Sequence, residues 1–307
     1  ILTTKISNNL KNIEFSGDIK IIRCKPTLKI YRGFYSIELV LKFSKIYRNF
    51  DIVNIHLPLV EIFPIIFFFK SKNTIVNYHC LPEFPFFLKI IKFYFYFFGF
   101  CSVLLSKKTM VLSEDYFNHF LFHKSISKKV IENPPFTLLQ NESPRTKNKE
   151  QEIKIGYLGR LSDEKGLEYL LEASKMLLIN NVEHKITLAG DTEDQRFAKY
   201  INKIIRKSKF NSKINFIGKL NEIQKKEFFE NIDIFVLPSI NSFEAFGIVQ
   251  LEAMSHGVPV IASNIVGVRT IIQKTKNGFL FNKKSSKDLY EKILICYETG
   301  FDPNLIK

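Results

Sequence analysis

Hydrophobic and polar positions alternate in blocks through the second half of the chain, where short apolar runs are followed by amphipathic segments. Most of the apolar runs end at glycine or proline, which is typical of buried strands that stop at a turn. The predicted strands are 153–158, 184–189, 213–218, 233–238, 258–262 and 277–281. The predicted helices are 166–178, 196–208, 222–231 and 247–256. This alternation predicts an α/β domain with a parallel sheet, and such sheets bind ligands beyond the carboxyl ends of their strands.

The first half is less regular, yet its pattern is also that of an α/β domain. Strands are predicted at 19–24, 51–56 and 74–79, and a helix is predicted at 34–47. A polar, proline-containing stretch separates the two halves and is typical of a linker. We therefore predict an incomplete N-terminal domain at 1–138, a linker at 139–152 and a second domain at 153–307.

An unusually aromatic segment, 84–105, interrupts this pattern. Its longest run without a charge, 93–105, has 13 residues and is shorter than the ~20 needed to span a bilayer. Lysines flank this run on both sides: Lys89, Lys92, Lys107 and Lys108. A true transmembrane segment is the least favoured interpretation, and two others remain open. The segment is either a buried helix of the first domain, or a helix whose apolar edge enters a membrane interface while the lysines reach lipid phosphates.

The net charge of +15 is concentrated in the first half, where residues 1–150 hold 22 lysines and arginines against 11 acidic residues. A basic surface suits an anionic membrane or nucleic acid, but the sequence contains no recognised nucleic-acid motif, so we predict no nucleic-acid partner. The four cysteines are widely spaced, which favours reduced thiols in a cytoplasmic protein. The chain begins with Ile1 and without a leader pattern, so we predict no signal peptide and a native N-terminus further upstream.

A glycine-containing turn follows the predicted strand 153–158. It holds Gly159 and Arg160, and Lys165 and Gly166 open the next predicted helix. The free N–H groups and the positive dipole end of a helix N-terminus favour an anion, and the two cations add to this preference. Cations near a helix start are more often simply solvated, so a phosphate site here needs support from a second segment.

That support comes from the loop and helix that follow the predicted strand 233–238. Glu244 precedes the predicted helix, and Gly247 in its first turn lets a ligand approach the backbone. The N–H groups around Phe246, Gly247 and Ile248 form a second predicted anion-binding terminus. Glu252 lies among apolar residues, where a carboxylate needs partners. The vicinal hydroxyls of a ribose would supply them.

Six ordered segments of the second half together resemble glycosyltransferase family 4. They are G-x-L-G-R-L-x-x-x-K-G at 156–166, A-G-D at 189–191, I-x-F-I-G at 214–218, D-I-F-V-L-P-S at 233–239, E-A-F-G-I-V-Q-L-E-A-M-S-H-G-V-P-V-I-A at 244–262 and N-G-F-L-F at 277–281. The resemblance implies the α/β GT-B fold of retaining enzymes, with two facing Rossmann-like domains and parallel sheets. The family's first strand and glycine-rich loop have no counterpart here, so the first domain is expected to be truncated at its N-terminus.

The resemblance also implies roles for individual residues. The implied donor-binding residues are Gly159, Arg160, Lys165, Ala245, Phe246, Gly247, Ile248 and Glu252. The two cations would hold the donor diphosphate, Glu244 the sugar and Glu252 the ribose. His79, which ends V-N-Y-H, resembles the family's histidine at the reacting centre, so Glu244 and His79 are the implied catalytic residues. His56 ends an earlier predicted strand and is a candidate for the acceptor side.

The implied reaction moves a hexose-type sugar from a nucleoside-diphosphate sugar to a saccharide or lipid-linked acceptor, as in glycan, polysaccharide or lipopolysaccharide biosynthesis. The matching segments contain no D-x-D motif, so we expect no obligate metal and no other cofactor. The predicted location is the cytoplasm, with peripheral contact of the basic, aromatic first domain with an anionic membrane. The alternatives that remain open are another GT-B nucleotide-sugar enzyme such as an epimerase, an inactive module, and a nucleic-acid-binding module.

Overall fold

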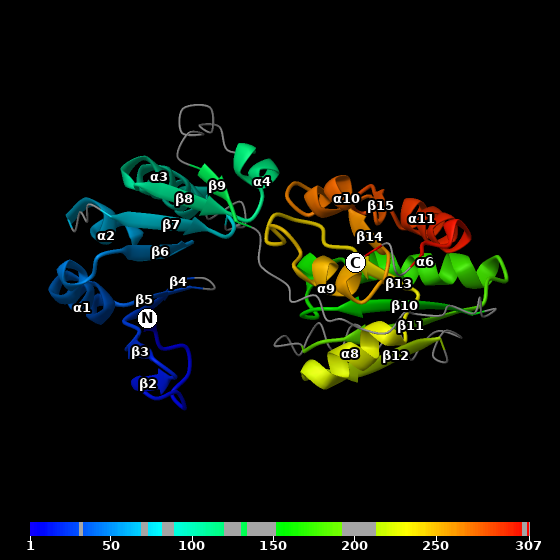
Figure 1. Ribbon diagram of the computed structural model, residues 1–307, viewed down its shortest axis with the longest axis horizontal. Helices are drawn as coiled ribbons and strands as arrows, with labels where there is room; N and C mark the ends of the chain where they lie inside the picture. Colours follow the sequence, from blue (N-terminus) through cyan, green and yellow to red (C-terminus); the bar gives the residue numbers. More distant parts are fainter. Residues whose placement is uncertain are drawn as a thin grey trace. The chain divides into compact units, whose positions relative to one another are not determined.

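The computed structural model describes residues 1–30, 33–68, 73–81, 89–119, 130–133, 152–191, 213–302 and 306 (Figure 1). The chain divides into two compact units, Ile1–Asn133 and Pro134–Lys307. The predicted linker, apart from its last residue, lies outside the described residues, and so does the predicted helix 196–208. Both units combine helices with a parallel sheet, which confirms the predicted α/β class.

The first unit contains a four-stranded parallel sheet in the order β6-β7-β8-β9. Its strands are β6 (Val53–Leu57), β7 (Thr74–Tyr78), β8 (Lys108–Val111) and β9 (Val130–Glu132). Its helices are α1 (Ile37–Ile46), η1 (Tyr47–Asn49), α2 (Ile62–Phe68), α3 (Lys89–Leu105) and α4 (Glu114–Asn118). The predicted strands at 51–56 and 74–79 are confirmed. The predicted helix at 34–47 begins later, because Ser36 caps α1 by accepting a hydrogen bond from the Leu39 N–H at 3.2 Å.

Two small sheets precede the four-stranded sheet along the chain. The predicted strand 19–24 is β3 (Ile19–Cys24), which pairs parallel to β1 (Leu2–Thr4) and antiparallel to β2 (Ile13–Ser16). The strands β4 (Leu28–Ile30) and β5 (Gly33–Tyr35) form an antiparallel pair. The strand prediction is therefore correct, but within the described ranges β3 belongs to a separate sheet and not to β6–β9.

The second unit contains a six-stranded parallel sheet in the order β12-β11-β10-β13-β14-β15. Its strands are β10 (Ile153–Leu158), β11 (His184–Ala189), β12 (Ile214–Gly218), β13 (Ile234–Leu237), β14 (Val260–Ser263) and β15 (Gly278–Phe281). All six predicted strands are confirmed, and β10 and β11 have the predicted bounds. The strand order reverses between β10 and β13, and doubly wound sheets bind ligands at such a point.

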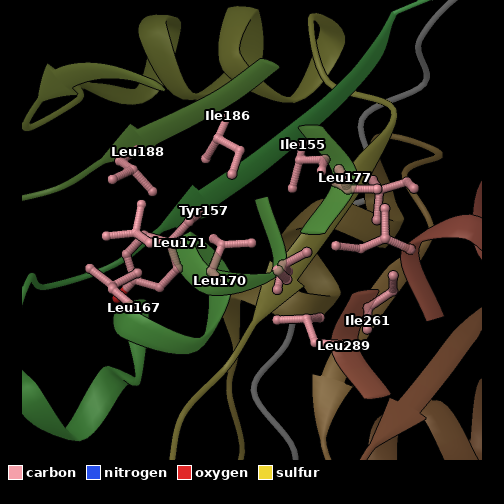
Figure 2. Packing of buried hydrophobic residues seen from close by; sticks show 14 of the residues in the cluster. Ile155, Tyr157, Leu167, Leu170, Leu171, Leu177, Ile186, Leu188, Ile261 and Leu289 are labelled. Atoms are coloured by element: carbon pink, nitrogen blue, oxygen red, sulfur yellow. The ribbon is translucent and has the colours of Figure 1, made fainter. Parts of the chain in front are cut away.

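The core of the second unit lies between this sheet and two of its helices (Figure 2). The helices of this unit are η4 (Asp163–Lys165), α6 (Leu167–Ile179), α8 (Glu222–Glu230), α9 (Val249–Ser255), α10 (Arg269–Thr275) and α11 (Ser286–Thr299). Figure 2 shows Ile155, Ile186 and Leu188 from the sheet together with leucines from α6 and with Leu289 from α11. Burying one such side chain contributes about 1.5–3 kcal/mol. This layer therefore anchors the carboxyl ends of β10 and β11, where the predicted donor loop begins.

Candidate active site

The loop after β10 is held by a buried tyrosine that the sequence did not single out. The Tyr157 hydroxyl donates a hydrogen bond to the main-chain oxygen of Arg160 at 2.8 Å, and Tyr157 is fully buried. Burial raises the pKa of Tyr157 far above its ordinary value, so the hydroxyl stays a neutral donor. The Arg160 guanidinium pairs with Glu164 at 2.9 Å, and its side chain remains 51% exposed. Arg160 therefore keeps a surface on which a ligand anion can bind.

Two glycines allow main-chain segments to meet beside this loop. Gly190 has φ +139°, and a Cβ atom there would lie 1.8 Å from the Gly159 oxygen. Gly159 N–H donates to the Ala189 oxygen at 3.0 Å, so the loops after β10 and β11 join directly beyond their strands. Gly166 has φ +64°, and a Cβ atom there would lie 2.2 Å from the Pro238 oxygen. These contacts bring the donor loop to the carboxyl end of β13.

An ion pair joins the loop after β10 to the segment after β13, the two segments predicted to bind the donor. The Lys165 ammonium pairs with the Glu244 carboxylate, and both side chains are more than four-fifths buried. The Ser239 hydroxyl donates to the same carboxylate oxygen at 3.4 Å. Lys165 was predicted to open a helix. It is instead the last residue of η4, because the left-handed backbone of Gly166 ends that turn before α6 begins.

The segment before α9 presents a row of main-chain donors. Within the part of the chain that the structure describes, the N–H groups of Ala245, Phe246, Gly247 and Ile248 donate to no main-chain or side-chain acceptor. The prediction that Gly247 lies in the first turn of the helix is wrong. Its φ of +75° is left-handed, so α9 begins only at Val249. Unpaired consecutive N–H groups beside a cation form a binding place for an anion.

A side chain that sequence reasoning missed holds this segment in place. Gln250 is fully buried, and its amide donates hydrogen bonds to the main-chain oxygens of Phe246 at 3.0 Å and Val268 at 3.1 Å. A Cβ atom on Gly247 would lie 2.8 Å from the same amide nitrogen. Gln250 therefore ties the segment from Ala245 to Ile248 to the body of the unit. A buried glutamine in an apolar helix is the signal that could have identified it.

The second glutamate of the predicted site has a lysine partner. Glu252 lies within α9, and its carboxylate accepts a hydrogen bond from the Lys225 ammonium of α8 at 2.9 Å. Burial opposes the charge of Lys225, but the hydrogen bonds and charges of Glu252 and Glu222 outweigh it and raise its pKa. The carboxylate is thus held at one oxygen while its side chain remains 31% exposed.

In the first unit the two predicted histidines contact each other. His56 lies in β6 and His79 directly follows the neighbouring strand β7. The His56 Nδ1 atom is 2.8 Å from the His79 Nε2 atom. Their rings stack with centroids 5.0 Å apart. Both residues are exposed overall, although part of the His79 ring is covered. This partial burial and the nearby charge of His56 lower the pKa of His79.

We expect His79 to titrate below the ordinary histidine value of about 6.5, and His56→Asn to raise its pKa by removing the neighbouring charge. Because the pKa is lower in the folded state, the unfolded chain binds more protons between the two pKa values. The contribution of His79 to the free energy of unfolding is therefore complete at pH values above its pKa in the unfolded chain. It is lost as the pH falls from that pKa through the pKa of the folded state. NMR titration of the imidazole measures both effects. Asn54→Ser, two residues earlier in β6, is the control, and an unchanged His79 pKa in His56→Asn would contradict the coupling.

A cavity of about 500 Å³ lies elsewhere in the second unit, between α8 and the strands β10, β11 and β12. Its lining includes Lys154, Lys185, Asn215 and Phe228, but neither cation and neither glutamate of the predicted donor site. The candidate site is instead defined by charge and by unpaired backbone donors at the strand ends. No group of three or more potential metal ligands occurs among the residues that the structure describes.

Residues 140–300, just over half of the chain, match the family described as Glycosyl transferases group 1. The chain belongs to this family. The predicted resemblance is therefore confirmed. The matched region of this group 1 glycosyl transferase contains every predicted donor residue, whereas His56 and His79 precede it.

Curated relatives match part of this chain over part of their own length. An uncharacterized glycosyltransferase of Methanocaldococcus jannaschii is 35% identical over 130 residues, which cover 42% of this chain and 32% of the relative. The capsular polysaccharide biosynthesis glycosyltransferase CapM of Staphylococcus aureus is 27% identical over 139 residues, which cover 45% of this chain and 35% of CapM. The chain thus spans about a third of the length of these two relatives.

Solved structures resemble this group 1 glycosyl transferase over most of its length. Sucrose-phosphate synthase from Thermosynechococcus elongatus has a TM-score of 0.77 and 18% identity, and the match covers 100% of this chain and 81% of that one. HepE of Anabaena, solved in complex with UDP-glucose, has a TM-score of 0.69 and 18% identity, covering 93% of this chain and 79% of that one. At such identities the likeness establishes the fold alone, and it confirms the predicted GT-B class.

Proposed function

We propose that this chain is the catalytic part of a retaining glycosyltransferase that uses a nucleoside-diphosphate sugar. The observation that carries the proposal is the Lys165–Glu244 ion pair, which joins the loop after β10 to the segment after β13. The cation and the carboxylate lie beyond β10 and β13, where the strand order reverses, and the four N–H groups that follow Glu244 donate to no acceptor among the described residues. Those are the groups that a sugar diphosphate requires.

In this proposal Arg160 and Lys165 bind the diphosphate, and the N–H groups from Ala245 to Ile248 bind its oxygens. Gly159 lets the loop pass close to the ligand. When the anomeric carbon loses its bond to the diphosphate oxygen, negative charge develops on the leaving group. Fixed cations and backbone dipoles stabilise that charge because they are already oriented before the reaction. A bound diphosphate would replace the Glu244 carboxylate as the partner of the Lys165 ammonium. The carboxylate would then be able to accept hydrogen bonds from the sugar.

We assign His79 to the reacting centre and His56 to the acceptor side, where their contact supports a joint role. The acceptor hydroxyl oxygen would form the new bond to the anomeric carbon on the face from which the diphosphate departs, and the acceptor proton would pass to a phosphate oxygen. We propose a hexose-type donor and a saccharide or lipid-linked acceptor. The complex of HepE with UDP-glucose supports the donor class, and the capsular polysaccharide relative CapM supports a saccharide acceptor.

The test combines donor binding with product analysis. Thermal shift against UDP-, GDP- and ADP-glucose identifies the donor, because a ligand that binds only the folded state raises its melting temperature. Proton NMR of the product made with that donor then reports the anomeric configuration. Retention with EDTA present supports the proposal. An inverted product, or no stabilisation by any donor, contradicts it, and release of free epimerised sugar without transfer favours an epimerase.

The Lys225–Glu252 contact gives a sharper prediction about the ribose. Replacing Lys225 by methionine keeps the apolar stem and removes the cation that orients Glu252. We expect the dissociation constant for the nucleoside diphosphate of the preferred donor to rise about tenfold, equivalent to roughly 1.4 kcal/mol. Isothermal titration calorimetry measures it. Lys226→Met, on the next position of α8, is the matched control, and equal affinities of the two variants would show that Glu252 does not depend on Lys225.

A further inference from the structure

The helix α3 exposes a continuous apolar stripe. Ile90 is 86% exposed, Phe93 67%, Phe97 44% and Leu104 41%. Their spacing of three, four and seven residues places them on one side of a helix. Phe93 and Phe97 stack with ring centroids 6.0 Å apart, so these two rings form one packed surface at the centre of the stripe.

The opposite side of α3 is packed against the sheet. Gly99, Ser102 and Val103 are buried, and a Cβ atom on Gly99 would lie 3.6 Å from the Tyr78 ring of β7. The interpretation of the aromatic segment as a buried helix of the first domain is therefore correct for only one side of α3. One side of α3 belongs to the core of the first unit, and the other side is exposed.

The helix α2 enlarges the exposed surface. Phe63 and Phe67 of α2 contact the Phe98 ring of α3 with centroids 4.9 and 5.7 Å apart, and both remain about two-fifths exposed. Phe68, at the end of α2, is 68% exposed. Figure 1 shows the two helices beside each other. An apolar surface shared by two packed helices is larger than the scattered apolar side chains that ordinary protein surfaces carry.

The exposed charges that the structure describes at the two ends of α3 are positive. Neither α2 nor α3 contains an acidic residue. Lys89 and Lys92 are exposed in the first turn of α3, and Lys107 and Lys108 are exposed just after its end. A second copy of this chain fits poorly here. With lysines at both ends of α3, packing the helix on its copy in either direction brings like charges together.

We propose that α2 and α3 dock this protein on an anionic lipid membrane, with α3 lying in the plane of the interface. The helix is about 25 Å long, and no helix in the described residues is long and apolar enough to cross a bilayer. Ile90, Phe93 and Phe97 enter the boundary between head groups and acyl chains, and the lysines contact lipid phosphates. This surface lies in the first unit and does not depend on the donor chemistry proposed for the second.

The test is co-sedimentation of the full chain with phosphatidylglycerol vesicles and with phosphatidylcholine vesicles. We expect binding to the anionic vesicles only, weakened by salt because the lysine contribution is screened. The double variant Ile90→Ser/Phe93→Ser should bind at least about tenfold more weakly, since two buried apolar side chains leave the interface. Ile179→Ser, which changes a side chain 77% exposed on α6, is the control.

Equal pelleting of the double variant and the control would overturn the proposal, as would equal binding to both kinds of vesicle. Absence of vesicle binding together with a dimer that the double variant converts to a monomer in gel filtration would assign the surface to self-association instead. Thermal stabilisation by the nucleotide sugar is measured on the same variants. It should be unchanged, so failure of the membrane proposal is distinguishable from failure of the donor proposal.

Discussion

Replacing Glu244 by glutamine is expected to lower sugar transfer by about a hundredfold to a thousandfold, the usual cost of removing one preorganised group from a transition state. The substitution keeps the shape of the side chain but removes its negative charge. That charge pairs with Lys165 and strengthens the hydrogen bonds that the carboxylate accepts from the sugar. Nucleoside diphosphate affinity should be unchanged or higher, because Lys165 no longer has a competing carboxylate. Steady-state kinetics and calorimetry with the diphosphate separate the two effects.

Glu172→Gln is the matched control for this experiment. Glu172 lies on α6 with its side chain 52% exposed and pairs only with Lys175 among the ion pairs of the described residues. It should leave transfer unchanged. If Glu244→Gln retained the wild-type rate, or lost diphosphate affinity in parallel with the rate, Glu244 would not act on the sugar, and the proposed division of roles would be wrong.

Replacing Gly166 by alanine is expected to destabilise the second unit by about 3 kcal/mol, the sum of left-handed backbone strain and overpacking. The new Cβ atom would lie 2.2 Å from the Pro238 oxygen, a main-chain atom that cannot rotate away. Relief of that contact separates η4 from the end of β13, so Lys165 moves away from Glu244. Donor affinity should therefore fall together with stability. Urea unfolding and thermal shift with the donor measure the two losses.

Gly218→Ala is the control for this variant, because Gly218 also has a left-handed backbone, φ +75°, but a Cβ atom there would meet no atom of the described residues within 4 Å. It should cost only the backbone strain, about 1–2 kcal/mol. The difference between the variants isolates the contact with Pro238. Equal destabilisation by Gly166→Ala and Gly218→Ala would show that the close approach of Gly166 to the Pro238 oxygen is not needed for the fold or for the site.

Most strands of the second unit were predictable because β10, β11, β13 and β14 are largely buried and each is followed by a turn or loop. For β10 and β11 a short run with apolar residues at alternate positions, closed by glycine, defined both bounds. The first unit was less predictable for the same physical reason. The strands β1, β4 and β5 have three residues each and are not fully buried, so they leave no period that a sequence pattern can show.

The candidate site also contains a part that the sequence predicted and a part that it did not. The motifs around Arg160 and Glu244 identified the residues and the family. They did not identify Tyr157, Gln250 or Lys225, whose role is to hold other groups. A supporting side chain is selected by its distance from a partner in space, and the pairing of Lys165 with Glu244 spans 79 residues of chain. The start of α9 was also misplaced, because the left-handed backbone of Gly247 is a property of the folded loop.

The sequence by itself determined the α/β class, the family, the residues expected at the donor and the excess of positive charge in the first half. Each of these depends on the order of residue types along the chain. Only the tertiary structure decided which cation faces which carboxylate, where four backbone N–H groups find no acceptor among the described residues, and which side of α3 is exposed. Those features depend on packing, because the sheet and the neighbouring helix cover one side of α3 and leave Ile90, Phe93 and Phe97 exposed.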